Sequence, residues 1–348
     1  MRQVYKFQES KLDELHEQVV YFFEVIYFQS LQGEIPWNDS FIHPRLKPIY
    51  DNCPKLRTTL KQVHSNYISV SNKEKYLIFE SAINSSDIGG ICNATILIGH
   101  IDDFTAPLGN AIHNLFRYLY YQLPDTKIFK NLYGDLITHY NNLKRLNRKI
   151  KMCPFCGMLP VKPLNSSTRQ TYDHYLPLSK YPFLALNTKN LVPTCKDCNE
   201  DHKKDKDVLY RNKARTLRRK LIYPFGHYNY TPIIIFKGYN FNPTTLEITN
   251  CSVQVSNTEG VFRREFQSWD EIYELNYRYK ITVIDDSKEW YEEYLDFVSQ
   301  KQIDETYVSE DLSYKDYLNA LKTIESTSNS FLKRPFFIEM ERLTNVFS

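Results

Sequence analysis

The sequence predicts an α+β protein in which a short, zinc-binding segment separates a mainly helical N-terminal region from a mixed C-terminal region. Three observations support this prediction. Apolar residues recur at helical spacing before position 150, two CxxC pairs lie between positions 153 and 198, and strand-like apolar runs follow position 232. We therefore expect three domains, at 1–146, 147–212 and 213–348.

The N-terminal region begins with a predicted amphipathic helix. Ser10 and Asp13 have the spacing of a capping box, and apolar residues follow at helical intervals. These residues are Leu12, Leu15, Val19, Phe22 and Ile26. A second helix is expected to begin at Asp125 and to run through Leu146 towards the first cysteine pair.

The C-terminal region combines both kinds of secondary structure. The runs 233–236 and 251–255 predict strands, the second through its alternation of apolar and polar residues. Ser268 and Glu271 have the spacing of a capping box and predict the start of a helix there. Further helices are expected at 288–300 and 313–326.

Composition and charge limit the class of protein. The chain has 348 residues, of which 42% are apolar, so it can build a sizeable core and is not a disordered protein. Its net charge of +3 gives no overall nucleic-acid signal, but basic residues flank the cysteine-containing segment on both sides. One cluster comprises Lys144, Arg145, Arg148, Lys149 and Lys151, and the other comprises Lys203, Lys204, Lys206, Arg211, Lys213, Arg215, Arg218, Arg219 and Lys220.

The cysteines indicate metal binding. No signal peptide or membrane-spanning stretch is recognisable, so we expect a cytoplasmic protein without a membrane partner, in which disulfides are rare. Cys153 with Cys156, and Cys195 with Cys198, each form a hook that can present two thiolates to one tetrahedral Zn2+. A four-thiolate site has no open coordination position, so this zinc is expected to be structural. Cys53, Cys92 and Cys251 are expected to be buried thiols.

Polar residues between and after the hooks form a recognisable pattern. The chain reads D-H-Y-L-P-x-S from Asp173, then N-L-V-P-x-C-x-x-C-N-x-x-H-K from Asn190. This pattern resembles the HNH endonuclease family, in the branch whose ββα-metal element is held by two CxxC pairs. The resemblance covers about a seventh of the chain and implies an HNH core within 147–212. The flanking regions give a weaker resemblance to bacterial phage-defence proteins.

The resemblance implies a role for each polar residue. His174 would act as the general base that activates water, since an imidazole titrates near neutral pH. Asp173 and Asn199 would hold a catalytic Mg2+ or Mn2+ through oxygen atoms, and Asn190 would fix the loop that carries His174. The other histidines are expected to have structural or surface roles. They are His16, His43, His64, His100, His113, His139 and His227.

Two points stay open in the sequence. Adjacent residues of a regular strand point to opposite faces, so Asp173 and His174 can serve one site only where the strand ends or twists. On an α-helix, Asn199 and His202 face the same way, so either or both can be the metal ligand. Lys203, Lys204, Lys206 and Arg211 are expected to contact nucleic-acid phosphates.

The predicted function is a metal-dependent endonuclease that hydrolyses phosphodiester bonds, most readily in DNA, in bacterial anti-phage defence. The alternative is a non-catalytic zinc module that binds nucleic acid or a partner protein, which needs only the four cysteines and the basic clusters. A third possibility is a nuclease subunit that a partner such as an ATPase activates.

Overall fold

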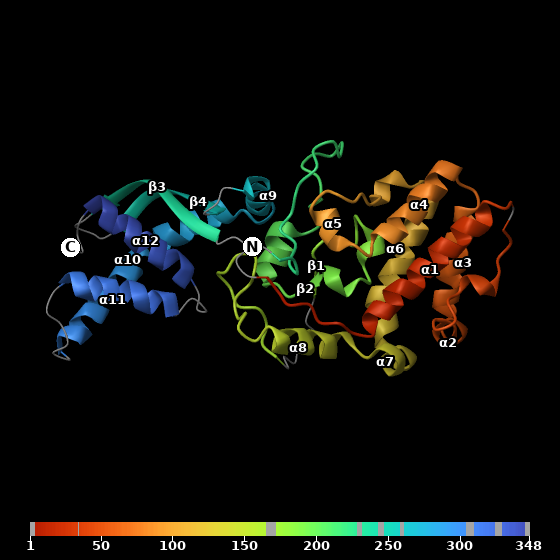
Figure 1. The fold of residues 1–348 in the computed structure, drawn as a ribbon, viewed down its shortest axis with the longest axis horizontal. Helices are drawn as coiled ribbons and strands as arrows, with labels where there is room; N and C mark the ends of the chain where they lie inside the picture. The colour runs from red at the N-terminus through yellow and green to blue at the C-terminus, as the bar shows by residue number, and fades with distance from the viewer. Residues whose placement is uncertain are drawn as a thin grey trace.

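The computed structural model describes residues 4–33, 35–164, 172–227, 232–242, 247–257, 261–303, 310–323 and 329–344. The chain forms an elongated molecule of mixed α+β class, with N-terminal helices at one end and the C-terminal region at the other (Figure 1). The short strands β1 and β2 lie between these two ends (Figure 1). The predicted class of α+β is confirmed at this level.

The N-terminal region consists of helices. The α-helices are α1 (Leu12–Ser30), α2 (Lys47–Asn52), α3 (Pro54–Tyr67), α4 (Asn72–Asn84), α5 (Ile88–Cys92), α6 (Ala106–Tyr121), α7 (Lys127–Tyr133) and α8 (Leu136–Leu146). The 3-10 turns are η1 (Asp39–Phe41), η2 (Ile101–Asp103) and η3 (Leu123–Asp125). Ser10 accepts a hydrogen bond from the Leu12 amide and Asp13 accepts one from the Ser10 amide, so the predicted capping box forms in part. The Asp13 amide donates to the Ser10 carbonyl instead of the hydroxyl. All five predicted apolar positions of α1 are buried.

The helix expected from Asp125 to Leu146 is wrong, because the structure has two helices there. Thr126 caps α7, and Gly134 ends it with φ +82°, a left-handed conformation that favours glycine. Asp135 then caps α8. A glycine of this kind stops a helix even where the apolar spacing continues across it.

The middle of the chain has little regular structure. It comprises β1 (Asp173–His174), η4 (Pro182–Leu184), η5 (Thr188–Asn190), β2 (Leu191–Val192) and the π-helical turn η6 (Asp197–Lys203). Strands β1 and β2 pair antiparallel, with Asp173 opposite Val192 and His174 opposite Leu191. A two-strand hairpin is followed directly by a helical turn.

In its described residues, the C-terminal region contains a second hairpin and four helices. These are β3 (Pro232–Asn242), β4 (Glu247–Asn257), α9 (Arg263–Tyr273), α10 (Leu275–Ile303), α11 (Glu310–Thr323) and α12 (Ser330–Thr344). Both predicted strands are confirmed within β3 and β4. The stretch 288–300 lies inside the longer helix α10, and α11 contains 313–323 of the other predicted helix, whose residues 324–326 lie outside the described part of the chain. The helix start predicted at Ser268 is wrong, because Ser268 is buried inside α9 and donates a hydrogen bond to the Arg264 carbonyl.

The middle segment shares a core with both flanking regions. The ring of Phe183 packs 5.0 Å from Phe23 and 5.4 Å from Phe116, measured between ring centroids. Phe155 stacks 4.7 Å from Tyr273 on the other side. Contacts therefore cross the positions 146 and 212, and the domain limits placed there stay a prediction.

Near its beginning, the chain lies along the middle segment. The Tyr5 amide donates to the Pro224 carbonyl, and the Tyr5 hydroxyl donates to the Pro193 carbonyl.

Among the described residues, no helix is both long enough and apolar enough to cross a membrane.

His16 provides a test of the packing between α1 and α4. Its ring is buried, Nε2 lies 3.2 Å from the Ser85 hydroxyl, and burial followed by the Lys189 charge lowers its pKa to about 4. The unfolded chain therefore takes up a proton first as the pH falls below 6.5, and stability is lost between that pH and 4. We expect the free energy of unfolding, measured in urea, to fall by roughly 2 kcal/mol more between pH 7 and 5 in the wild type than in His16→Gln. An equal decrease in both proteins would contradict the assignment.

Candidate functional site

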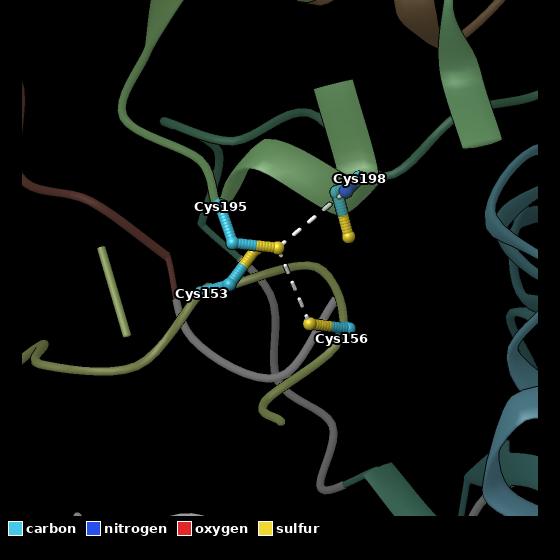
Figure 2. Close-up of side chains that lie close together, drawn as sticks. All are labelled: Cys153, Cys156, Cys195 and Cys198. Carbon is cyan, nitrogen blue, oxygen red and sulfur yellow. Dashed lines mark hydrogen bonds between the residues drawn. The ribbon is translucent and has the colours of Figure 1, made fainter. Parts of the chain in front are cut away.

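Four cysteine side chains converge at the centre of the molecule. The sulfurs of Cys153, Cys156, Cys195 and Cys198 all lie within 4.8 Å of one another, and all four residues are buried (Figure 2). The sulfurs of Cys156 and Cys195 are 3.7 Å apart. Four ligands at a Zn–S distance of about 2.3 Å around a tetrahedral ion would be separated by roughly 3.8 Å. The group therefore has the composition and spacing of a site that could hold a structural metal such as zinc.

Both cysteine hooks are held by hydrogen bonds from their surroundings. Gly157, with φ +71°, closes the first hook by donating its amide to the Cys153 carbonyl at 2.8 Å. The second hook opens η6. From α10, Arg278 donates to the Cys198 sulfur at 3.4 Å, and the Tyr279 hydroxyl donates to the Cys156 carbonyl at 2.7 Å. A guanidinium beside a thiolate offsets part of the negative charge that four thiolates bring to a divalent ion.

Asn190 fastens the loop between β1 and β2. Its fully buried side chain accepts a hydrogen bond from the Leu176 amide and donates to the carbonyls of Leu176 and Leu184. The predicted loop-fixing position of Asn190 agrees with these contacts. The loop residue Ala185, next to Leu184, in turn holds His174.

Asp173 and His174 line the same pocket, which has a volume of about 550 Å³. Strand β1 ends at His174, and both of its residues border this one pocket. That they serve one catalytic site stays a prediction.

The carboxylate of Asp173 has one paired oxygen and one unpaired oxygen. Its Oδ1 lies 2.7 Å from Nζ of Lys203, and both residues are almost completely buried. Its Oδ2 is buried and has no hydrogen-bond partner among the described residues. Burial raises the pKa of Asp173, and the Lys203 charge opposes this shift. An unpartnered buried carboxylate oxygen is the kind of group that a cation satisfies.

His174 is held by a backbone carbonyl. Its Nε2 lies 3.1 Å from the Ala185 oxygen, which can only accept, so Nε2 carries the proton and Nδ1 is the basic nitrogen. Burial lowers the pKa of His174 to about 4, so the ring is neutral at pH 7. The ring of Tyr120, from α6, packs edge-on at 4.2 Å between centroids. The imidazole is therefore fixed in both orientation and tautomer.

The turn η6 decides which of its residues reach the pocket. The Lys204 amide donates to the Asn199 carbonyl five residues earlier, as in a π-helix. Asn199 and Lys203 line the pocket together. His202 does not line it, and its Nδ1 lies 3.5 Å from the Glu274 carboxylate. The expectation that Asn199 and His202 face the same way does not hold in this structure.

Most of the predicted phosphate-binding residues contact the protein itself. Lys203 pairs with Asp173, and its Nζ also donates to the His174 carbonyl at 3.0 Å. Lys206 pairs with Glu274 and Arg211 with Glu271. Only Lys204 of this predicted group is an exposed residue on the pocket wall. Arg215, Arg218 and Arg219 of the same basic cluster also bond to protein atoms.

Helix α6 forms a wall of the pocket that sequence reasoning missed. His113, Arg117, Tyr120 and Tyr121 all line the pocket, although the sequence places them about 50 residues before Asp173. The spacing of His113, Arg117 and Tyr121 at i, i+4 and i+8 puts them on one face of the helix. That spacing was visible in the sequence, but an exposed polar stripe is typical of any amphipathic helix.

Comparisons with known proteins give limited information. No protein-family model matches the chain. No solved structure matches it. A stretch of 66 residues, 19% of this chain, is 35% identical to Protein ea31 of Escherichia phage lambda. That stretch covers 19% of the phage protein, so the similarity is confined to about a fifth of either chain.

The four-cysteine group predicts a measurable metal content. We expect about one zinc ion per purified chain by elemental analysis, because a closed four-thiolate site binds Zn2+ tightly. Cys195→Ser should lose this zinc and a large part of the unfolding free energy. Cys251→Ser is the matched control, since Cys251 is also buried but lies outside the group, and it should keep the zinc. Unchanged zinc content in Cys195→Ser would contradict the assignment.

The contacts of Asn190 predict a large loss of stability on truncation. Asn190→Ala would leave the Leu176 amide and two buried carbonyls without partners, so we expect the free energy of unfolding to fall by about 3 kcal/mol. Asn114→Ala, at an exposed position of α6, should change it by less than about 0.5 kcal/mol. Unfolding in urea measures the free energy of unfolding of both variants. Similar values for the two variants would show that the Asn190 contacts do not stabilise the loop.

Proposed function

We propose that this protein is a metal-dependent endonuclease of the HNH type, with the ββα-metal core formed by β1, β2 and η6. One observation carries the proposal. Asp173 and His174 of strand β1 line a single pocket together with Asn199 of the turn η6. The four cysteines hold this turn beside the hairpin. The order of hairpin and helical turn is that expected of this core.

The donor set suits a hard divalent cation. The unpartnered Oδ2 of Asp173 and the amide oxygen of Asn199 would hold Mg2+ or Mn2+, the kinds of ion that prefer oxygen ligands. When bound, the ion would supply positive charge against the phosphate and the leaving oxygen. Lys203 keeps the Asp173 carboxylate in place beside the pocket. His202 lies outside this donor set, so Asn199 is the preferred ligand.

The remaining residues of the site activate the attacking water and hold the loop in position. Nδ1 of His174 accepts a proton from the attacking water, since Nε2 is committed to the Ala185 carbonyl. Tyr120 holds the ring, and Asn190 holds the loop that contains Ala185. The cysteine group takes no part in the reaction and acts as a support.

The proposal extends to substrate and setting. The resemblance favours DNA as the substrate and bacterial anti-phage defence as the setting, with nucleic acid as a partner and an ATPase as a candidate activating subunit. Within the 66-residue stretch, the chain is related to a protein of a bacteriophage.

A nicking assay tests the proposed chemistry. Supercoiled plasmid is incubated with wild type, His174→Ala and Asp173→Ala in Mg2+ or Mn2+. We expect both variants to lose roughly 10²- to 10⁴-fold in cleavage rate, the usual contribution of a general base. His227→Ala, at an exposed position away from the pocket, is the control and should cut like the wild type.

Two outcomes would reject the assignment. Equal cleavage by wild type and His174→Ala would remove His174 as the base. DNA binding without cleavage, in either metal and after addition of a cell extract that supplies activating subunits, would instead favour the non-catalytic zinc module.

A further inference from the structure

The face of helix α6 that borders the pocket carries positive charge without an internal partner. We propose that Arg117 on this face, with His113 beside it, binds a backbone phosphate of the nucleic-acid strand that enters the pocket. This inference rests on the proposed function, because it concerns the substrate of that same site. The inference assigns part of the substrate contact to the N-terminal helices, for which the sequence predicted no catalytic or binding residue.

The position of α6 is fixed by its buried face. Leu108, Ile112, Leu115 and Leu119 are completely buried in the core. Phe116 stacks on Phe23 at 6.1 Å and packs against Phe183, which belongs to the loop between β1 and β2. The helix and the hairpin loop are therefore packed as one unit. This packing fixes the backbone of Arg117 relative to His174, and only the side chain of Arg117 can change its position.

Arg117 differs from the arginines of the basic cluster that follows the second cysteine hook. Arg211 and Arg219 pair with Glu271, and Arg215 pairs with Asp103. Arg117 is exposed, lines the pocket, and has no carboxylate within ion-pair distance among the described residues. A guanidinium without an internal partner can give both of its forked donors to a phosphate.

The charges around the pocket leave Arg117 in a favourable place for an anion. Lys203 and Asp173 neutralise each other, and Glu200 on the pocket wall lies within 3.9 Å of Lys196. Burial and then the charge of Arg117 lower the pKa of His113, so His113 is a neutral hydrogen-bonding group at pH 7. Arg117 and Lys204 therefore remain on the wall as cations for a ligand, beside one carboxylate, Asp205, that also lines the pocket, so the balance of these charges is positive.

The route of a bound strand follows from the same helix. Tyr120, one turn after Arg117 on α6, touches His174. A strand whose scissile phosphate lies beside His174 must therefore continue past α6 if it leaves the pocket on this side. The neighbouring phosphate would then come within reach of the Arg117 guanidinium.

A binding measurement that needs no cleavage tests this inference. A fluorescein-labelled DNA oligonucleotide is titrated with full-length protein by fluorescence anisotropy, without added Mg2+ or Mn2+, between about 50 and 200 mM salt. We expect Arg117→Gln to weaken binding roughly tenfold and to reduce the salt slope by about one. Arg117→Lys should retain the slope, because it retains the charge.

Arg342→Gln is the matched control. Arg342 is also exposed but lies on α12 at the opposite end of the molecule (Figure 1). Arg342→Gln should leave the DNA affinity and its salt slope unchanged. Wild-type affinity in Arg117→Gln, or an equal loss in Arg342→Gln, would overturn the inference.

The assay separates this inference from the proposed catalysis. If the wild type cuts plasmid while Arg117→Gln binds like the wild type, the phosphate contact is wrong and the nuclease proposal survives. If no protein cuts but Arg117→Gln still loses affinity and salt slope, the phosphate contact stands and the catalytic proposal fails.

Discussion

The convergence of four buried sulfurs is the constraint on which the rest of the candidate site depends. Strands β1 and β2 have two residues each, and so short a hairpin has little stability of its own. Cys195 and Cys198 attach η6 to the hook of Cys153 and Cys156, which places Asn199 and Lys203 opposite Asp173. Because Arg278 and Tyr279 also contact this group, α10 supports the same arrangement from the C-terminal side.

The buried pair of Asp173 and Lys203 is the second determinant of the site. Taking two charges out of water is costly, and a pair separated by 2.7 Å recovers that cost only when further hydrogen bonds satisfy both groups. Lys203 gains such a bond from the His174 carbonyl, whereas Oδ2 of Asp173 gains none. Among the described residues the pair is therefore incompletely satisfied at Oδ2, the oxygen that the proposal assigns to the metal.

Sequence reasoning predicted the local parts of this site and missed those that depend on distant packing. The cysteine hooks follow from spacing, because a tight turn determines their geometry, whereas the fastening role of Asn190 was implied by the family resemblance. The sequence left Asn199 and His202 open as metal ligands, and which of them lines the pocket depends on a π-helical turn whose hydrogen bonds shift by one residue. Ser268 matched a helix start but lies inside α9, because burial against the core outweighs a local capping pattern. The wall formed by α6 needs the whole helical core to place it.

The long sequence separation of the contacts made by the first helix has a consequence for synthesis of the chain. Asp13 of α1 accepts a hydrogen bond from Thr188, 175 residues later, and Phe23 of the same helix packs against Phe183. At a ribosomal rate of about 5–20 residues per second, helix α1 waits roughly 9–35 s before these partners have been made. During that interval the apolar face of α1 has only its neighbouring helices to cover it. A nascent chain that ends before Phe183 therefore leaves Phe23 of α1 without one of the ring contacts that it makes in the folded protein.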